Sequence, residues 1–515
     1  MADAPSTFNP ATLAPLEPVP SATEGEVQAA IARAQAAQPA WGRLPFTERE
    51  RRVIALGRAL MERRAAVSEL LWQETGRPPL ESFMAELAVS VGYCKRGAKL
   101  ARTALAPEKV PLSPLEFPKK RAVIHPVARG VVGIIAPWNY PVGNFMKSLV
   151  PALLSGNAVV MKPSEHTPRA GAWLGALVSE ICGKDLAVVV QGAGDVGAAV
   201  IAGVDAVVFT GSVPTGKRVA LAAAERLIPC SVELGGKDAA IVLADCDLDR
   251  TVLGIAQWGF HNAGQNCAGI ERVYVEDAIA DRFVSALGRV ASRLRVATGP
   301  EDGASDLGPL QNPAQLRIVE AHVNAAKADG AVVIAGGHPV GPGWGYAPTV
   351  LDRCTDAMTV VAEETFGPVL AVVRVRSAEE GLRLANASKY GLNGSIWTSD
   401  LARGEELARR LDVGVAYVNN HALGGTMPEV PWTGVRETGP GIAQSRHAYG
   451  TFVRRQTVLV DGNTDPDPYW MPFDEHLRPF AEALAEMQLG SLRSTIRLLG
   501  LLKKRVGALK AFARA

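Results

Sequence analysis

From Gly130 onward, short apolar runs alternate with segments in which apolar residues recur at helical spacing, and this alternation constrains the fold most. The first series predicts strands at 131–136, 158–162, 187–191 and 206–210, and helices at 144–154, 168–182, 196–203 and 216–226. A second series begins at Asp249 and continues to Leu411. Strands that alternate with helices form parallel, doubly wound sheets. The chain is therefore predicted to be an α/β protein.

Length and composition set further limits. A chain of 515 residues is too long for one core and should contain at least two domains. The formal charge of +2 argues against a nucleic-acid partner. The six cysteines are scattered without a CxxC pair, so we expect no metal site and no disulfide framework, and a cytoplasmic location fits best. No apolar run reaches the roughly 18 residues that a membrane-spanning helix needs, and the N-terminus lacks a secretory signature.

One cysteine lies in a loop that is unlike a core segment. Cys267 stands among small and polar residues, between Gly264 and Gly269. A buried small hydrophobe is the common alternative for a lone cysteine. Upstream, however, Glu233 ends an apolar run before paired glycines, and Asn139 supplies an amide donor. A nucleophile, a base and an oxyanion donor are the three parts that acyl chemistry requires, so these residues predict a catalytic site.

Two glycine-containing segments compete as the phosphate-binding loop. A literal GxGxxG pattern at 192–197 follows a strand, but the acidic residue expected about 20 positions later is poorly placed, so we interpret it as a structural turn. The segment 209–216 is the better candidate, because a predicted strand ends there in a glycine turn and a helix is predicted to start near Gly216. Amides at a helix N-terminus bind phosphate well.

Six motifs identify a family that the chain resembles. PWNYP, KPSEHTP, FTGSVPTGKRV, VELGGKD, GQNCAG and EETFGPV occur in the order and at about the spacing of the aldehyde dehydrogenase superfamily, and the similarity covers roughly residues 9–460. The resemblance implies two doubly wound α/β domains, one of them a Rossmann-like cofactor domain, with a small β oligomerisation hairpin and hence a homodimer or homotetramer. The implied boundaries are 1–106 and 129–235 for the NAD-binding domain, 236–447 for the catalytic domain, 107–128 and 448–460 for the hairpin, and 461–515 for a helical C-terminal extension.

The resemblance also implies roles for individual residues. Cys267 would attack an aldehyde to give a thiohemiacetal and then a thioester, Glu233 would activate the hydrolytic water, and Asn139 would hold the oxyanion with the Cys267 N–H. The cofactor would be NAD, with NADP as the alternative. Its implied contacts are Trp138, Lys162, Glu165, Gly211, Ser212, Gly216, Leu234, Glu364 and Phe366. Because Glu165 would repel a 2′-phosphate, NAD is favoured.

Two departures from the family pattern bear on the site. Many members carry a lysine where this chain has Ser148, and Lys147 is one residue away, which questions a lysine that assists Glu233. Where members often have Pro-Phe-Gly-Gly, this chain has Trp432 in a Pro-Trp-Thr-Gly sequence, so the rim of the site is expected to differ. A catalytically silent relative with a structural or binding role is the alternative function, but both Cys267 and Glu233 are present.

The end of the chain has a basic amphipathic pattern. Helices are predicted near 475–488 and 491–512, and residues 491–515 contain seven basic residues and no acid. On a helical wheel most basic residues fall opposite the leucines, with Arg505 as the exception. Such a helix can contact a membrane surface or cover the substrate entrance, by similarity to membrane-associated fatty aldehyde dehydrogenases, or it can pack on the protein itself.

Overall fold

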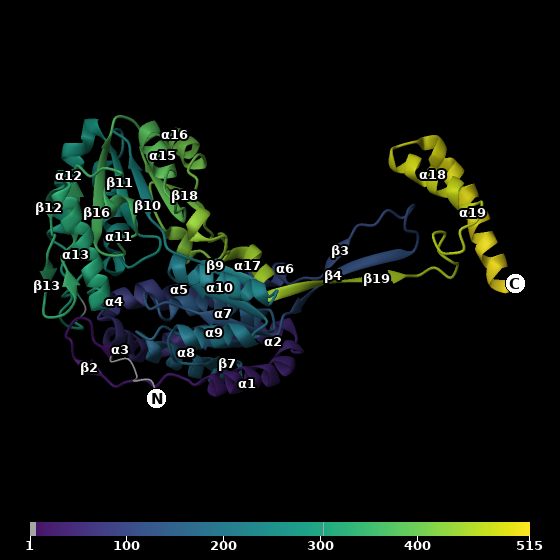
Figure 1. Ribbon diagram of the computed structural model, residues 1–515, viewed down its shortest axis with the longest axis horizontal. Helices are drawn as coiled ribbons and strands as arrows, with labels where there is room; N and C mark the ends of the chain where they lie inside the picture. The colour runs from purple at the N-terminus through teal and green to yellow at the C-terminus, as the bar shows by residue number, and fades with distance from the viewer. Residues whose placement is uncertain (1–6, 302) are drawn as a thin grey trace. The chain divides into compact units, whose positions relative to one another are not determined.

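The computed structural model describes residues 7–301 and 303–515, and the chain divides into two compact units (Figure 1). The first unit comprises the chain up to Leu105 together with Ala128–Arg454. The second comprises Ala106–Val127 and Arg455–Ala515. The first unit contains two large sheets with helices, and the second contains a small sheet and two helices.

A five-stranded parallel sheet forms the first half of the larger unit. Its spatial order is β7 (Ala187–Val189), β6 (Ala158–Lys162), β5 (Val131–Ile135), β8 (Ala206–Thr210) and β9 (Cys230–Glu233). Numbered along the chain, the order is 3-2-1-4-5, the doubly wound arrangement of dinucleotide-binding folds. The order reverses between β5 and β8, and ligands bind such sheets outside the strand ends at that reversal.

Helices surround this sheet and make one continuous core with it. Its crossover helices are α7 (Gly143–Leu154), α8 (Pro168–Ile181), α9 (Gly194–Gly203) and α10 (Val213–Glu225). Three helices precede the sheet, α1 (Glu24–Gly42), α2 (Phe46–Glu62) and α3 (Arg64–Thr75). A helical run then continues through α4 (Pro79–Ser82), α5 (Ala88–Gly92) and α6 (Ala98–Ala104), joined by π-helical turns at Phe83–Leu87 and Tyr93–Gly97. Before α1, β1 (Thr7–Phe8) pairs with β2 (Pro15–Leu16), whereas residues 1–6 of the predicted extended arm lie outside the described residues.

A seven-stranded sheet forms the second half of the larger unit. Its order is β12 (Val332–Ala335), β15 (Thr349–Asp352), β16 (Val369–Val375), β11 (Ile270–Glu276), β10 (Asp238–Val242), β17 (Asn393–Trp397) and β18 (Val415–Val418). Of these pairs only β12–β15 is antiparallel. Its helices are α11 (Leu248–Phe260), α12 (Asp277–Ala291), α13 (Pro313–Ala328), α14 (Thr359–Ala362), α15 (Ala378–Asn386) and α16 (Leu401–Arg409). A further helix, α17 (Ser445–Phe452), packs on α6 and α7, and β13 (Pro339–Val340) pairs with β14 (Gly345–Tyr346).

Alternate residues of the central strands enter two separate cores. In β10, Ala239 and Ile241 lie in the core that contains α13, α15 and α16, whereas Ala240 and Val242 lie in the core that contains α11 and α12. A strand that is buried on both faces needs apolar residues at every position. The strands of this parallel sheet are therefore continuous apolar runs in the sequence rather than alternating apolar and polar residues. The prediction of two doubly wound α/β domains with a helical C-terminus is confirmed.

The second unit contains a three-stranded sheet in the order β19 (Val453–Asp461), β4 (Lys120–Ala128) and β3 (Glu108–Val110), although the first residues of β19 and the last of β4 belong to the larger unit. Lys120 in β4 forms ion pairs with Asp461 and Asp467, at 2.5 and 2.6 Å. Every residue of β19 after Val453 is exposed.

The C-terminal extension folds as two helices of this second unit. α18 (Leu477–Gln488) and α19 (Leu492–Arg514) pack through a core that includes Phe480 and Leu498. Arg505, the exception on the helical wheel, is fully buried. Its guanidinium donates to the carbonyl groups of Pro468 and Pro472 and pairs with Asp474 at 2.7 Å. Arg505 therefore holds the segment before α18 against α19. Across the described residues, no helix is long and apolar enough to cross a bilayer.

Candidate active site

Cys267, the predicted nucleophile, follows a tight left-handed turn. Asn262 and Ala263 both have φ of 53°, and Gly264 has φ of 71°. A Cβ on Gly264 would lie 1.9 Å from the carbonyl oxygen of Gly367, so no larger residue fits there. The turn ends α11 and leads the chain through Cys267 to the start of β11. The glycine noted in the sequence therefore fixes the path of the loop.

Glu233, which the sequence analysis predicted to be the catalytic base, lies beside the Cys267 thiol. It is the last residue of β9, and its Oε1 is 3.6 Å from the Cys267 Sγ. Burial, reinforced by the negative charge of Glu233, raises the pKa of Cys267 well above the usual thiol value, while Lys147 opposes this shift. The thiol is therefore protonated at neutral pH, and it needs a base to become a nucleophile.

Two side chains hold the Glu233 carboxylate. The indole Nε1 of Trp432 donates to Oε1 at 2.5 Å, and the Lys147 ammonium lies 3.3 Å from Oε2. The same ammonium lies 4.6 Å from the centroid of the Trp432 ring. The departure at Ser148 left open whether any lysine contacts Glu233. Lys147 on α7 does so, although it is one residue away from the usual position of that lysine in the family. The contact between Trp432 and Glu233 was not predicted. From the sequence, Trp432 indicated only that the rim of the site differs from that of other family members.

Asn139 lies in the loop after β5 with its side-chain amide fixed by neighbours. Its Nδ2 donates to the Gln265 carbonyl at 3.0 Å, and its Oδ1 accepts from the Asn144 side chain at 3.0 Å. A primary amide carries two N–H groups, so one remains after the Gln265 contact. The structure thus places Asn139 against the loop that carries Cys267, two residues before the nucleophile.

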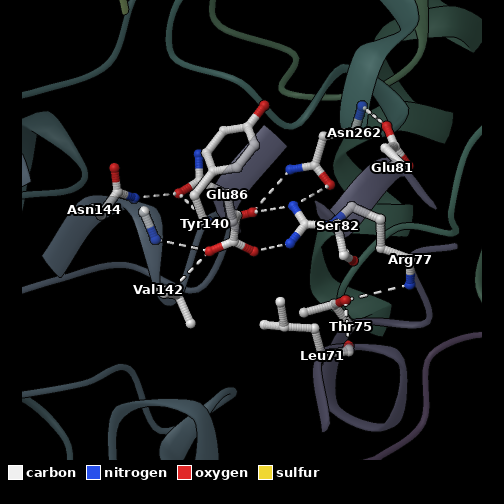
Figure 2. Close-up of polar contacts among 12 residues, drawn as sticks. Leu71, Thr75, Arg77, Glu81, Ser82, Glu86, Tyr140, Val142, Asn144 and Asn262 are labelled. Atoms are coloured by element: carbon white, nitrogen blue, oxygen red, sulfur yellow. Dashed lines mark hydrogen bonds and ion pairs between the residues drawn. The ribbon is translucent and has the colours of Figure 1, made fainter. Parts of the chain in front are cut away.

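A buried ion pair ties the two loops together (Figure 2). Arg77 and Glu86 pair with each other, and Arg77 also donates to the Asn139 carbonyl at 3.1 Å and the Asn262 side chain at 3.3 Å. Glu86 accepts from the backbone N–H groups of Val142 and Gly143, at 2.6 and 2.9 Å. The pair therefore fixes both the Asn139 loop and the turn before Cys267. The pair was not predicted, because the groups that it holds lie 56 to 185 positions away in the chain.

A cavity of about 470 Å³ lies at the carboxyl ends of β5, β6 and β8, where the strand order reverses. Lys162, Glu165, Gly211 and Ser212, four of the residues predicted to contact the cofactor, line it. The Lys162 ammonium lies 3.7 Å from the Glu165 carboxylate, and burial lowers the pKa of Lys162. The rest of the wall is mostly apolar, with the hydroxyl groups of Ser164, Thr210 and Thr215 and the guanidinium of Arg218. A buried cation, a helix N-terminus and an apolar groove are groups that suit the phosphates and the base of a dinucleotide.

Gly216 has a different role from the one predicted. α10 begins at Val213 rather than near Gly216, and the Gly216 N–H donates within the helix to the Ser212 carbonyl at 2.9 Å. That amide is therefore not free for a phosphate. A Cβ on Gly216 would lie 2.1 Å from the side chain of Leu234, so the glycine permits close packing of α10 on Leu234. Neither residue is among those that line the cavity.

The GxGxxG segment at 192–197, interpreted from the sequence as a structural turn, lies beside the same cavity. Gly194 and Gly197 line the same cavity as Gly211. No atom lies within 4 Å of the position that a Cβ on Gly194 would take. The segment opens α9 beside the cavity, whereas the sequence alone favoured a turn with a structural role only.

The remaining predicted cofactor residues meet near the Cys267 loop. The rings of Trp138 and Phe366 make an edge contact with centroids 5.5 Å apart. Glu364 accepts from the Gly236 N–H at 2.9 Å, and burial raises its pKa to about 8. The Thr365 and Phe366 N–H groups donate to Glu271, which pairs with Lys237. This second buried pair, unforeseen from the sequence, fixes the loop that carries Glu364 and Phe366.

A second cavity, of about 270 Å³, opens on the Cys267 side chain. It is lined by residues of the helical run 79–104, of α7 and of α11, and by the loops that carry Ala422 and Trp432. Cys267 therefore faces a space large enough for a small organic molecule. Within the described part of the chain, no cluster of three or more His, Cys, Asp or Glu side chains is suited to hold a metal ion.

Comparison with known proteins agrees with this geometry. A model of the aldehyde dehydrogenase family matches residues 2–458, which leaves the C-terminal extension outside it. A relative from Mycolicibacterium smegmatis, provisionally named succinate-semialdehyde dehydrogenase (NADP+), is 36% identical over 462 residues, 88% of either chain. The structure of lactaldehyde dehydrogenase from Escherichia coli is 33% identical with a TM-score of 0.85, over 90% of this chain and 96% of that one.

Betaine aldehyde dehydrogenase from Staphylococcus aureus, solved in complex with NAD+, is 28% identical with a TM-score of 0.85, over 91% of this chain and 96% of that one. A family match over most of the chain, two relatives above 30% identity and a shared fold all point the same way. The chain belongs to the aldehyde dehydrogenase family, whose members of this type are NAD(P)-dependent oxidoreductases.

Proposed function

We propose that this protein oxidises an aldehyde to a carboxylic acid by a hydrolytic route, with Cys267 as nucleophile, Glu233 as base and Asn139 as oxyanion donor. The observation that carries the proposal is the 3.6 Å contact between the Cys267 thiol and the Glu233 carboxylate, at the edge of a cavity that suits a small substrate. Bound NAD(P)+ supplies the hydride acceptor.

The residues of the site support the following sequence of proton and bond changes. Glu233 takes the proton from the Cys267 thiol, and the sulfur attacks the aldehyde carbon. The free Asn139 N–H and the Cys267 backbone N–H stabilise the negative oxygen of the thiohemiacetal. After the hydride leaves, a thioester remains on Cys267. Glu233, having released its first proton to solvent, deprotonates a water molecule that attacks the thioester, and the acid leaves as the thiol is restored.

NAD is proposed as the preferred form of the cofactor. Glu165 lines the cofactor cavity, and its negative charge disfavours the 2′-phosphate that distinguishes NADP. Arg218 lines the same cavity and opposes this effect, but its guanidinium contacts the Thr215 hydroxyl at 3.2 Å. Relatives are named for NADP as well as solved with NAD+, so the ratio of kcat/KM for the two cofactors decides the preference.

A homodimer or a dimer of dimers is proposed for the assembly. β19 is an edge strand, and Val458, Leu459 and Val460 on it are exposed. A long apolar edge strand favours pairing with another chain. β19 pairs with β4 of its own chain, within the hairpin that the resemblance implied, so its other edge is the one free to pair with a second copy. Light scattering that gives a monomer mass at micromolar concentration would contradict the assembly.

We also propose a cytoplasmic location and a contact of α19 with a membrane surface. A free thiol nucleophile supports a reducing compartment. For α19, the exposed Leu492, Ile496, Leu499 and Phe512 beside basic residues support the membrane contact. Binding to anionic vesicles should weaken when Lys503 and Lys504 are both changed to Glu. Arg505 is kept in this variant, because it holds the segment before α18. Unchanged binding would exclude the contact.

The proposed activity is tested with purified protein, a panel of aldehydes and either cofactor. Reduced cofactor should appear together with one equivalent of carboxylic acid, and alkylation of Cys267 should stop both. Formation of reduced cofactor by the Cys267→Ser variant at the wild-type rate would exclude the thioester route. Product acid that appears only when coenzyme A is added would exclude hydrolysis.

A further inference from the structure

The cavity at Cys267 indicates which aldehydes the site accepts, and this inference rests on the proposed function. We propose that the substrate is an uncharged aldehyde with an apolar tail, such as an aryl or medium-chain alkyl aldehyde, and not a semialdehyde that carries a carboxylate. The relative from Mycolicibacterium smegmatis is named for a substrate of the second kind. The lining of the cavity indicates that this protein prefers a different class of aldehyde from the one in the relative's name.

Carbon atoms dominate the lining of the cavity. Its large side chains are mostly aromatic or aliphatic: Met84, Val89, Tyr93, Tyr140, Trp258 and Trp432. The π-helical turns at Phe83–Leu87 and Tyr93–Gly97 carry Met84 and Tyr93, and π-helical turns often occur at functional sites. An apolar tail would therefore exchange water for carbon contacts, which is favourable in proportion to the area buried.

The polar atoms of these aromatic residues already have partners in the protein. The Tyr93 hydroxyl donates to the Gly425 carbonyl, and the Tyr140 hydroxyl lies 3.0 Å from Nδ1 of His261. The Trp258 indole donates to Asn420 at 3.1 Å. The aromatic side chains thus offer contact area to a substrate rather than hydrogen bonds. Gln257, Asn144 and Asn266 add neutral amides to the lining and Thr426 adds a hydroxyl, and none of these groups carries a charge that could balance a carboxylate.

A carboxylate on the substrate would find no free cation in the cavity. Among the described residues that line it, Lys147 is the one with a permanent charge, and its ammonium is occupied by Glu233 and the Trp432 ring. His261 also lines the cavity, but burial and the nearby Arg77 lower its pKa to about 4, so it is neutral. A buried charge without a partner is strongly unfavourable.

A cationic substrate is disfavoured by the same arrangement. A trimethylammonium group is usually held over the faces of aromatic rings. Here the Trp432 ring already contacts the Lys147 ammonium. The remaining carboxylate near this ring, Glu233, is held by Trp432 and Lys147 together. An aldehyde with a quaternary amine would therefore meet the Lys147 ammonium beside Trp432, and none of the described residues that line the cavity carries a carboxylate to balance its charge.

Steady-state kinetics with four aldehydes test the proposal. Hexanal and benzaldehyde should each show a kcat/KM about 100-fold above that of succinate semialdehyde and of betaine aldehyde, since an uncompensated buried charge costs at least this factor. A kcat/KM for either charged aldehyde that equals or exceeds that of hexanal would overturn the inference. In that case the oxidation itself, and with it the proposed function, would stand. Absence of turnover with all four would instead contradict the proposed function.

A charge introduced at the cavity gives a second, independent test. Met84 lines the cavity and is 60% exposed, so a longer side chain there can be accommodated. Met84→Arg should raise kcat/KM for succinate semialdehyde about tenfold and lower that for hexanal, because an apolar contact of the tail is lost. Met84→Gln, a neutral residue of similar length, is the control: it loses the same apolar contact but adds no charge, so it should not raise kcat/KM for succinate semialdehyde. An equal gain with Met84→Gln, or no gain with Met84→Arg, would count against the missing cation as the cause.

Discussion

Replacing Trp432 with Phe isolates one hydrogen bond at the proposed base. The change keeps an aromatic ring in the cavity but removes the Nε1–H that donates to Glu233 Oε1 at 2.5 Å. A hydrogen bond to a charged group contributes about 1.5–3 kcal/mol, and about 1.4 kcal/mol corresponds to a factor of ten in rate. If this bond holds Glu233 toward Cys267 in the transition states, kcat should fall by roughly 10- to 100-fold. KM for the aldehyde should change little, because the ring still lines the cavity.

A matched control separates this effect from a general disturbance of the cavity. Trp258→Phe makes the same chemical change on the same cavity, but its indole donates to Asn420 and not to Glu233. The assay is the formation of reduced cofactor with hexanal, with kcat and KM determined for both variants and thermal unfolding recorded in parallel. A Trp432→Phe enzyme with wild-type kcat would refute the reasoning. So would a Trp258→Phe enzyme that loses as much kcat as Trp432→Phe at unchanged stability.

Three further predictions concern the chemistry and the cofactor. Cys267→Ala should abolish turnover and leave NAD binding, measured by calorimetry, close to wild type; residual activity above a few per cent would remove the nucleophile role. Glu233→Gln should slow the first turnover at neutral pH, and this rate should rise with pH because the raised pKa of Cys267 leaves little thiolate below it; a wild-type burst at neutral pH would confine Glu233 to hydrolysis. Glu165→Ser should raise kcat/KM for NADP relative to NAD about tenfold, whereas an unchanged ratio would exclude repulsion by Glu165.

Features set by local sequence were predicted well. The alternation of strands and helices predicted the doubly wound fold, because apolar runs and helical periodicity are local properties of the chain. Two inner strands of the seven-stranded sheet were missed, β10 (Asp238–Val242) and β15 (Thr349–Asp352). β10 follows the paired glycines so closely that its short apolar run was not recognised as a strand. The pairing of Cys267 with Glu233 was predicted from the motif resemblance, and the structure brings their side chains together.

Features set by contacts between distant segments could not be predicted. Trp432 and Glu233 are 199 positions apart, and a tryptophan in a loop gives no sign of its hydrogen-bond partner. Gly216 was assigned to phosphate binding, but its role in packing depends on where α10 starts, and helix ends are poorly defined by sequence. On the helical wheel Arg505 falls among the apolar residues rather than with the other basic ones. Its hydrogen-bond partners lie in an irregular segment, and such a segment has no periodicity from which the contact could be predicted.

The buried pair of Arg77 and Glu86 has a consequence for engineering by recombination. It contacts the Asn139 loop and the Asn262 turn, and so joins the part of the chain proposed to bind the cofactor to the part that carries Cys267. A chimaera that exchanges the segment up to residue 235 with that of another family member replaces Arg77, Glu86 and Asn139 together but leaves Asn262 behind. Compatibility at this one junction, more than overall identity, should decide which hybrids keep an ordered active site.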